Sequence, residues 1–120
     1  MNKMVKSNTH LLATIAALKK KSLEEQKGIW KAVALSLQAP RRIKRVVNLS
    51  KLSRYTKEND VVIVPGKVLG GGDLSHKLTI AAFTFSQEAV EKITKHNGTV
   101  LTMNELMEKY PKGTGVKIIG

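Results

Sequence analysis

The stretch that decides the fold is VVIVPGKVLGGG, residues 61–72. Its first four residues, Val61 to Val64, are β-branched and apolar, with no polar residue alternating among them. A continuous run of this kind is typical of a strand buried on both faces, as in a parallel sheet. We predict that this strand ends at Pro65 and Gly66.

Short strands alternate with short helices on either side of this stretch. The other candidate strands are residues 46–47, 78–83, 99–101 and 116–119. Three helical segments are expected between them. The first is a short helical turn from Asn48 to Tyr55, and the last begins at the capping box of Thr102 and Glu105. The middle one is capped by Ser86, and its buried face is formed by Ala89, Val90 and Ile93. The alternation predicts an α/β fold with a mostly parallel sheet.

Two helices are predicted ahead of the sheet. A set of apolar residues at helical spacing indicates an amphipathic helix over about residues 8–20: Leu11, Leu12, Ile15 and Leu18. Ser22 and Glu25 form a capping box that predicts the start of the second helix, and Pro40 predicts its end. Trp30, the only tryptophan, is expected to anchor the core between these helices.

The chain carries a large excess of positive charge. It has 21 Lys and Arg against 9 Asp and Glu, which gives a net charge of +12. Because such an imbalance makes a compact domain repel itself, a polyanionic partner is the natural inference. The charge is also concentrated, since one segment without any acidic residue holds seven basic ones: Arg41, Arg42, Lys44, Arg45, Lys51, Arg54 and Lys57. We expect it to contact a phosphate backbone.

A glycine-rich loop over residues 65–77 is the second candidate site. Gly70, Gly71 and Gly72 allow close approach of the backbone, and their N–H groups can form an anion-binding concavity. The flanking residues Lys67, His76 and Lys77 add positive charge or donors. The cluster Lys19, Lys20 and Lys21 has two interpretations, stabilisation of a helix C-terminus or contact with RNA, and both can hold.

Several function classes are disfavoured by the same residues. The glycine run matches neither the P-loop nor the Rossmann pattern, because the spacing differs and a strand, not a helix, follows it. No catalytic carboxylate pair or nucleophile stands out, and the absence of cysteine excludes a disulfide scaffold and a cysteine zinc site. We expect no enzyme activity, no cofactor, no metal and no small-molecule substrate.

The expected location is the cytoplasm. No apolar run approaches the roughly 18 residues of a membrane span, and the N-terminal sequence does not resemble a signal peptide. Aromatic residues make up only 4% of the chain. Recognition should therefore depend on the shape and backbone of folded RNA rather than on unpaired bases.

Three segments together resemble a known family. They are Arg41 to Leu52, Val61 to Gly72, and the run HKLTIAAFTFS over residues 76–86. In this order they are similar to archaeal and eukaryotic large-subunit ribosomal protein eighteen, which is related to bacterial large-subunit protein fifteen. The length resembles that of the archaeal members.

The resemblance implies an irregular, mainly parallel α/β fold and a structural role in the large ribosomal subunit. It implies RNA contacts at Arg41, Arg42, Arg45 and the loop from Lys67 to His76, while Lys44, Lys51 and Arg54 are added from charge alone. The implied partners are large-subunit ribosomal RNA and neighbouring ribosomal proteins. We expect one domain over residues 1–120, with a helical part over 1–39 and an RNA-binding α/β core over 40–120.

Other functions stay open at this point. A general nucleic-acid packaging protein would share the charge but would bind duplex DNA as well. An enzyme acting on a nucleotide or RNA would require turnover, which the loop pattern does not favour. A membrane-surface role needs a basic amphipathic helix, and residues 8–21 are a poor example of one.

Overall fold

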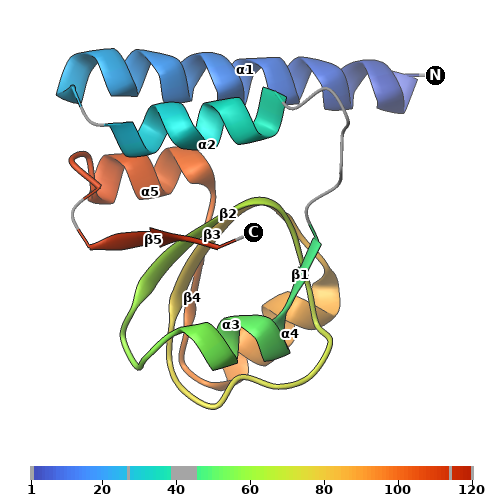
Figure 1. The fold of residues 1–120 in the computed structure, drawn as a ribbon. Helices are drawn as coiled ribbons and strands as arrows, with labels where there is room; N and C mark the ends of the chain where they lie inside the picture. The colour runs from blue at the N-terminus through green and yellow to red at the C-terminus, as the bar shows by residue number, and fades with distance from the viewer. Residues whose placement is uncertain (1, 27, 39–45, 114, 120) are drawn as a thin grey trace.

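The computed structural model describes residues 2–26, 28–38, 46–113 and 115–119, with side chains from residue 11 onward. Its elements are α1 (Asn2–Glu25), α2 (Gly28–Gln38), β1 (Val46–Asn48), α3 (Leu49–Tyr55), β2 (Val61–Leu69), β3 (Thr79–Phe85), α4 (Gln87–Lys95), β4 (Thr99–Leu101), α5 (Met103–Lys109) and β5 (Val116–Ile118) (Figure 1). The predicted α/β fold preceded by two helices is confirmed.

The sheet is built around β2. Strands β1, β2, β3 and β4 lie side by side in that order, and every pairing in the described sheet is parallel. Strand β3 pairs along most of β2, whereas the other edge of β2 is shared. There β5 pairs with Val61 to Ile63 and β1 pairs with Lys67 to Leu69. Two short strands therefore share one edge of the longest strand.

The prediction that β2 ends at Pro65 and Gly66 is wrong. The strand continues to Leu69, and its register against β3 shifts between Val64 and Lys67. A bulge of this kind accommodates the missing amide of proline without ending the strand. Pairing partners on both edges hold the second half of β2 in place.

Both faces of the sheet are covered, as the apolar run predicted. Val62 and Val64 point into a core shared with α3 and α4, and Ile63 points into a second core shared with α1, α2 and α5. Figure 1 shows these two layers of helices on opposite sides of the sheet. Trp30 belongs to the second core, is fully buried, and donates an Nε1–H hydrogen bond to the carbonyl of Pro111 at 2.7 Å.

Two capping boxes were predicted and one is wrong. Thr102 caps α5 with the full reciprocal pattern, in which its hydroxyl accepts from Glu105 N and the Glu105 carboxylate accepts from Thr102 N. Ser22, in contrast, lies within α1, which continues to Glu25, and the Glu25 carboxylate is 3.7 Å from the Lys21 ammonium. The chain leaves the helix only at Gln26, where φ is +54°.

Two smaller expectations also need correction. Lys19, Lys20 and Lys21 do not end α1, which has no basic residue in its last turn, so they do not stabilise that helix terminus. Val90 lies at the exposed side of α4, while Ala89 and Ile93 are fully buried as predicted. Ser86 does cap α4, because its hydroxyl accepts from Ala89 N at 3.1 Å.

Candidate nucleic-acid interface

The glycine-rich loop and helix α3 form one continuous surface. The loop leaves β2 after Leu69 and passes the start of α3, where Ser50 N donates to Gly71 O at 3.0 Å. Gly71 N donates in turn to the Asn48 side-chain oxygen at 3.1 Å. Asn48 precedes α3 but does not cap it with its side chain, which instead bonds to the loop. These paired contacts fix the loop against the helix.

Close approach explains the glycines of this loop. A Cβ on Gly71 would lie 2.5 Å from the side-chain oxygen of Asn48, and one on Gly72 would lie 2.6 Å from Ser50 Cβ. Gly72 also has φ of +79°, which side chains disfavour. The space next to these glycines is therefore filled by the protein itself, and the N–H of Gly71 is already bonded.

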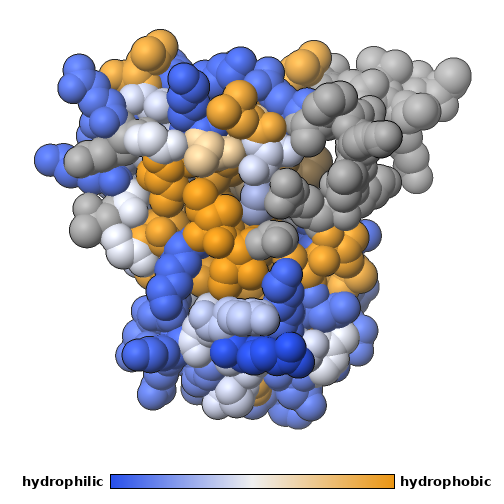
Figure 2. Space-filling model, in the orientation of Figure 1, coloured by the Kyte–Doolittle hydropathy of each residue, from blue (hydrophilic) through white to orange (hydrophobic). Residues whose placement is uncertain are grey.

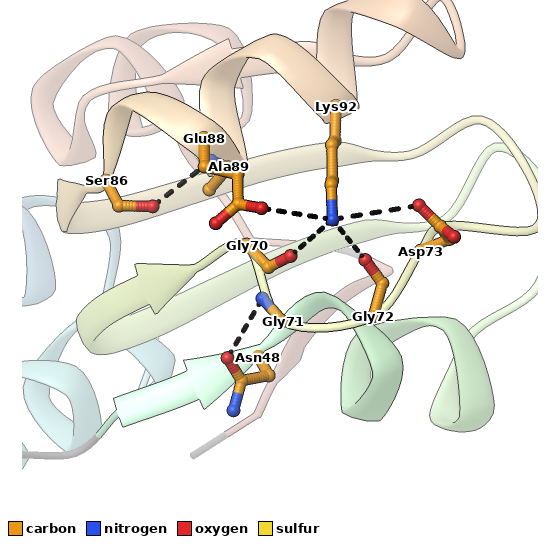
Figure 3. Close-up of polar contacts among 9 residues, drawn as sticks. All are labelled: Asn48, Gly70, Gly71, Gly72, Asp73, Ser86, Glu88, Ala89 and Lys92. Carbon is orange, nitrogen blue, oxygen red and sulfur yellow. Dashed lines mark hydrogen bonds and ion pairs between the residues drawn. The ribbon is translucent and has the colours of Figure 1, made fainter.

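Lys92 of α4 holds the loop from the other side (Figure 3). Its ammonium donates to Gly70 O and Gly72 O, both at 2.8 Å. It also lies 3.3 Å from the Glu88 carboxylate and 3.8 Å from that of Asp73. Its charge is thus compensated within the protein, so Lys92 acts on the loop rather than on a partner.

A chain of hydrogen bonds continues from the loop along α3. Ser75 N donates to Ser53 Oγ at 3.0 Å, and the two hydroxyls are 2.6 Å apart. The His76 ring lies between Ser75 Oγ at 2.9 Å from Nδ1 and Thr56 Oγ1 at 2.8 Å from Nε2. Because the Thr56 hydroxyl donates to Leu52 O, it accepts from Nε2–H. Both ring nitrogens of His76 therefore have a hydrogen-bond partner within the protein.

The predicted cations of this region point outward instead. Among the exposed basic side chains, four come from α3, from β2 and from the loop, and in the described part of the chain none of these has a carboxylate within 4 Å: Lys51, Arg54, Lys67 and Lys77. We call these four the free cations. Lys51 and Arg54 come from α3, Lys67 from β2 next to β1, and Lys77 from the end of the loop.

An ion pair joins β5 to the turn between α3 and β2. Asp60 Oδ2 accepts from Lys57 N at 2.8 Å and from the Lys117 ammonium at 2.9 Å. The Lys57 amide first, and then the Lys117 side chain, hold the pKa of Asp60 below its ordinary value of 3.8. This contact joins β5 to the turn that precedes β2.

Three of the remaining predicted site residues lie away from this surface. Lys19, Lys20 and Lys21 lie on α1, in the helical layer on the opposite side of the sheet from α3 and α4 (Figure 1). Lys19 and Lys20 are exposed, and Lys21 pairs with Glu25. Arg41, Arg42, Lys44 and Arg45 lie outside the described residues, immediately before β1 in the sequence.

Other kinds of site find no support in the described ranges. No group of three or more metal-binding side chains forms there. No helix among the described residues is long and apolar enough to cross a membrane.

Sequence reasoning missed the residues that shape the loop. Asn48, Ser53 and Lys92 each bond to it from 20 or more residues away. Asn48 had a local signal, because it precedes a helix, but the cap it suggests is not made. Lys92 had no local signal, since a lysine on an exposed helical face is ordinary.

Known proteins resemble this chain over nearly its full length. The family model for ribosomal protein 60S L18 and 50S L18e matches residues 3–120. The large ribosomal subunit protein eL18 of Methanothermobacter thermautotrophicus is 42% identical over 119 residues, covering 99% of this chain and 98% of that relative. Its namesake from Methanococcus maripaludis is 44% identical over 119 residues, covering 99% of each. The one from Archaeoglobus fulgidus is 40% identical over 116 residues, covering 97% and 99%. The chain therefore belongs to the family of ribosomal proteins 60S L18 and 50S L18e, a structural family of the large subunit and not a family of enzymes.

Proposed function

We propose that this protein binds folded large-subunit ribosomal RNA as a structural constituent of the cytoplasmic large ribosomal subunit. The proposed contacts are the free cations, the glycine-rich loop from Gly70 to Lys77, and the basic segment Arg41 to Arg45 that precedes β1. Lys19 and Lys20 would contact RNA on the helical layer. Neighbouring ribosomal proteins would complete the surroundings of the chain.

One observation carries the proposal. The polar groups of the loop are bonded inward, whereas the free cations lack acidic partners within the described chain. Unpaired surface cations on a rigid framework suit phosphates, because their charge is not already neutralised by a carboxylate and little loop entropy remains to be lost on binding. The mechanism is charge neutralisation, which lets RNA segments approach one another at a spacing set by the protein.

The test is binding to large-subunit ribosomal RNA over a range of salt concentrations. Neutralising roughly 6–10 phosphates predicts that log affinity falls linearly with log salt, by about 0.7–0.9 for each phosphate. Replacing Lys51 or Arg54 by alanine should weaken binding and reduce that slope by about one. Lys109→Ala, at an exposed position of α5, is the matched control.

Three results would count against the proposal. Affinity that does not change with salt would remove the mechanism. Equally tight binding of duplex DNA in competition would favour a general packaging protein instead. In the cell, the protein should sediment with the large subunit after a high-salt wash of the lysate; a protein found only at the top of the sucrose gradient would refute the assignment.

A further inference from the structure

A groove runs between β5 and α3, the helix that carries the free cations Lys51 and Arg54. It has a volume of about 630 Å³ and is lined by Lys51 and Tyr55 from α3, by Lys117 and Ile118 from β5, and by Ile119 directly after β5. Figure 2 shows an apolar surface at the centre of the face on which β5 and α3 lie, with hydrophilic side chains below it.

The floor and wall of this groove are unusually exposed apolar groups. Tyr55 is 58% exposed and Ile118 is 42% exposed, although both are large. Helix α3 packs into the core through Leu49 and Leu52, whereas the Tyr55 ring lies outside the core. The Arg54 guanidinium lies 6.0 Å from the centroid of that ring, over its face. The ring is therefore exposed to solvent, and a cation lies over one of its faces.

The charges around the groove suit a nucleotide. Lys51 and Arg54 are free cations, one lining the groove and the other beside the ring, so they can each receive a phosphate. Lys117 lines the opposite wall, and Asp60 fixes its ammonium at 2.9 Å. An ammonium has three N–H donors, so Lys117 can still donate to the edge of a base.

We infer that this groove binds one unstacked nucleotide of the RNA, whose base stacks on Tyr55 while its flanking phosphates contact Lys51 and Arg54. Stacking on an aromatic face tolerates any base, and an adjacent arginine adds a cation–π contribution. Charge complementarity favours a nucleotide over an apolar peptide segment. This inference rests on the proposed RNA binding, and it adds one base contact to a surface expected from its composition to read only the backbone.

The first experiment compares three variants in the salt-dependent binding assay. Tyr55→Ala should weaken binding to large-subunit ribosomal RNA by about 5- to 150-fold, as the loss of one stacked base does. The salt slope should not change, because no charge is removed. Tyr55→Phe keeps the ring and should bind like wild type. Leu35→Ala, at a position 53% exposed on α2, is the control for loss of an exposed apolar side chain.

The second experiment locates the contact directly. Ultraviolet irradiation of purified large subunits, followed by nuclease digestion and peptide mass spectrometry, should give a nucleotide adduct on Tyr55. If Tyr55→Ala binds as tightly as Leu35→Ala while Lys51→Ala and Arg54→Ala still weaken binding, the base contact is refuted and the proposed function stands. A crosslink from Tyr55 to protein instead of RNA would refute it in the same way. If the wild-type protein itself showed no salt-dependent binding to large-subunit ribosomal RNA, the proposed function would be overturned.

Discussion

Replacing Lys92 by methionine should loosen the glycine-rich loop and weaken the whole protein. The substitution removes the hydrogen bonds from the ammonium to Gly70 O and Gly72 O, both 2.8 Å long, and leaves the loop carbonyls without that donor. It also removes the ion pairs with Glu88 and Asp73. Methionine keeps most of the apolar stem, so the change isolates the charged end of the side chain.

The magnitude follows from the exposure of each partner. A hydrogen bond from a charged group contributes about 1.5–3 kcal/mol when well shielded. The Lys92 side chain is 30% exposed, so we take the low end for each of the two bonds. Its carboxylate partners are 64% and 81% exposed, and exposed ion pairs contribute about 0–1 kcal/mol. The sum is a loss of about 3 kcal/mol, which corresponds to a fall in Tm of about 12 °C for a chain of this size.

Urea unfolding followed by the fluorescence of Trp30 is the assay. Trp30 lies fully buried in the core on the other side of the sheet, so it reports global unfolding rather than movement of the loop. The matched control is Lys95→Met, which removes the same charge from an exposed position of the same helix. If the two variants were equally stable, the contacts of Lys92 would contribute nothing and the loop would not depend on them.

RNA affinity gives a second reading of the same pair of variants. Both lose one positive charge, but Lys92 already has carboxylate partners and Lys95 has none in the described chain, so the direct electrostatic loss should be no larger for Lys92→Met than for Lys95→Met. Only Lys92→Met releases the loop, and the binding surface must then be ordered as RNA binds. We expect it to bind RNA several-fold more weakly than Lys95→Met. Equal affinities would mean that the loop takes no part in binding.

Three further substitutions test other parts of the structure. Trp30→Phe should lower the free energy of unfolding by about 2–4 kcal/mol in thermal melts followed by circular dichroism, through a lost hydrogen bond and a small cavity. Gly72→Ala should lower the free energy of unfolding by about 2–4 kcal/mol, measured with urea, because φ is +79° and the new Cβ would clash with Ser50. Gly28→Ala is the control, because it has open space around it and should be neutral or stabilising. Asp60→Asn should destabilise at neutral pH. Because the folded pKa of Asp60 is below 3.8, the greater stability of the wild type should be present above that value and should disappear as the pH falls through the folded pKa. Urea unfolding of both proteins at neutral pH and at a pH below the folded pKa is the measurement. An equal difference between their urea midpoints at these two pH values would contradict the prediction.

The two capping-box patterns show when a local sequence pattern predicts the start of a helix correctly. The capping box at Thr102 is real because that residue follows a strand and already has an extended backbone, with φ of −79° and ψ of 165°. The same pattern at Ser22 lies in a run of good helix formers with no residue to interrupt it. A capping-box pattern therefore marks the start of a helix only where the residues before it are not themselves helical.

The strand β2 shows the opposite error. Proline and glycine at positions 65 and 66 predicted the end of the strand, but β2 pairs with β3 on one edge and with β1 on the other beyond these two residues. Such pairings join residues distant in sequence, so no local window contains them. Lys92 was missed for the same reason, since its partners in the loop precede it by about 20 residues.

The structure divides the basic residues between two tasks. Lys92 and Lys117 face carboxylates and hold, respectively, the glycine-rich loop and the β5 edge in place. Lys51 and Arg54 lie between these fixed points on α3 and have no carboxylate within 4 Å in the described chain. A cation already paired inside the protein gains little from a phosphate, whereas an unpaired one gains the full interaction. Net charge alone therefore overstates the binding surface, and the internal ion pairs remove Lys92 and Lys117 from the cations that an RNA partner could fully neutralise.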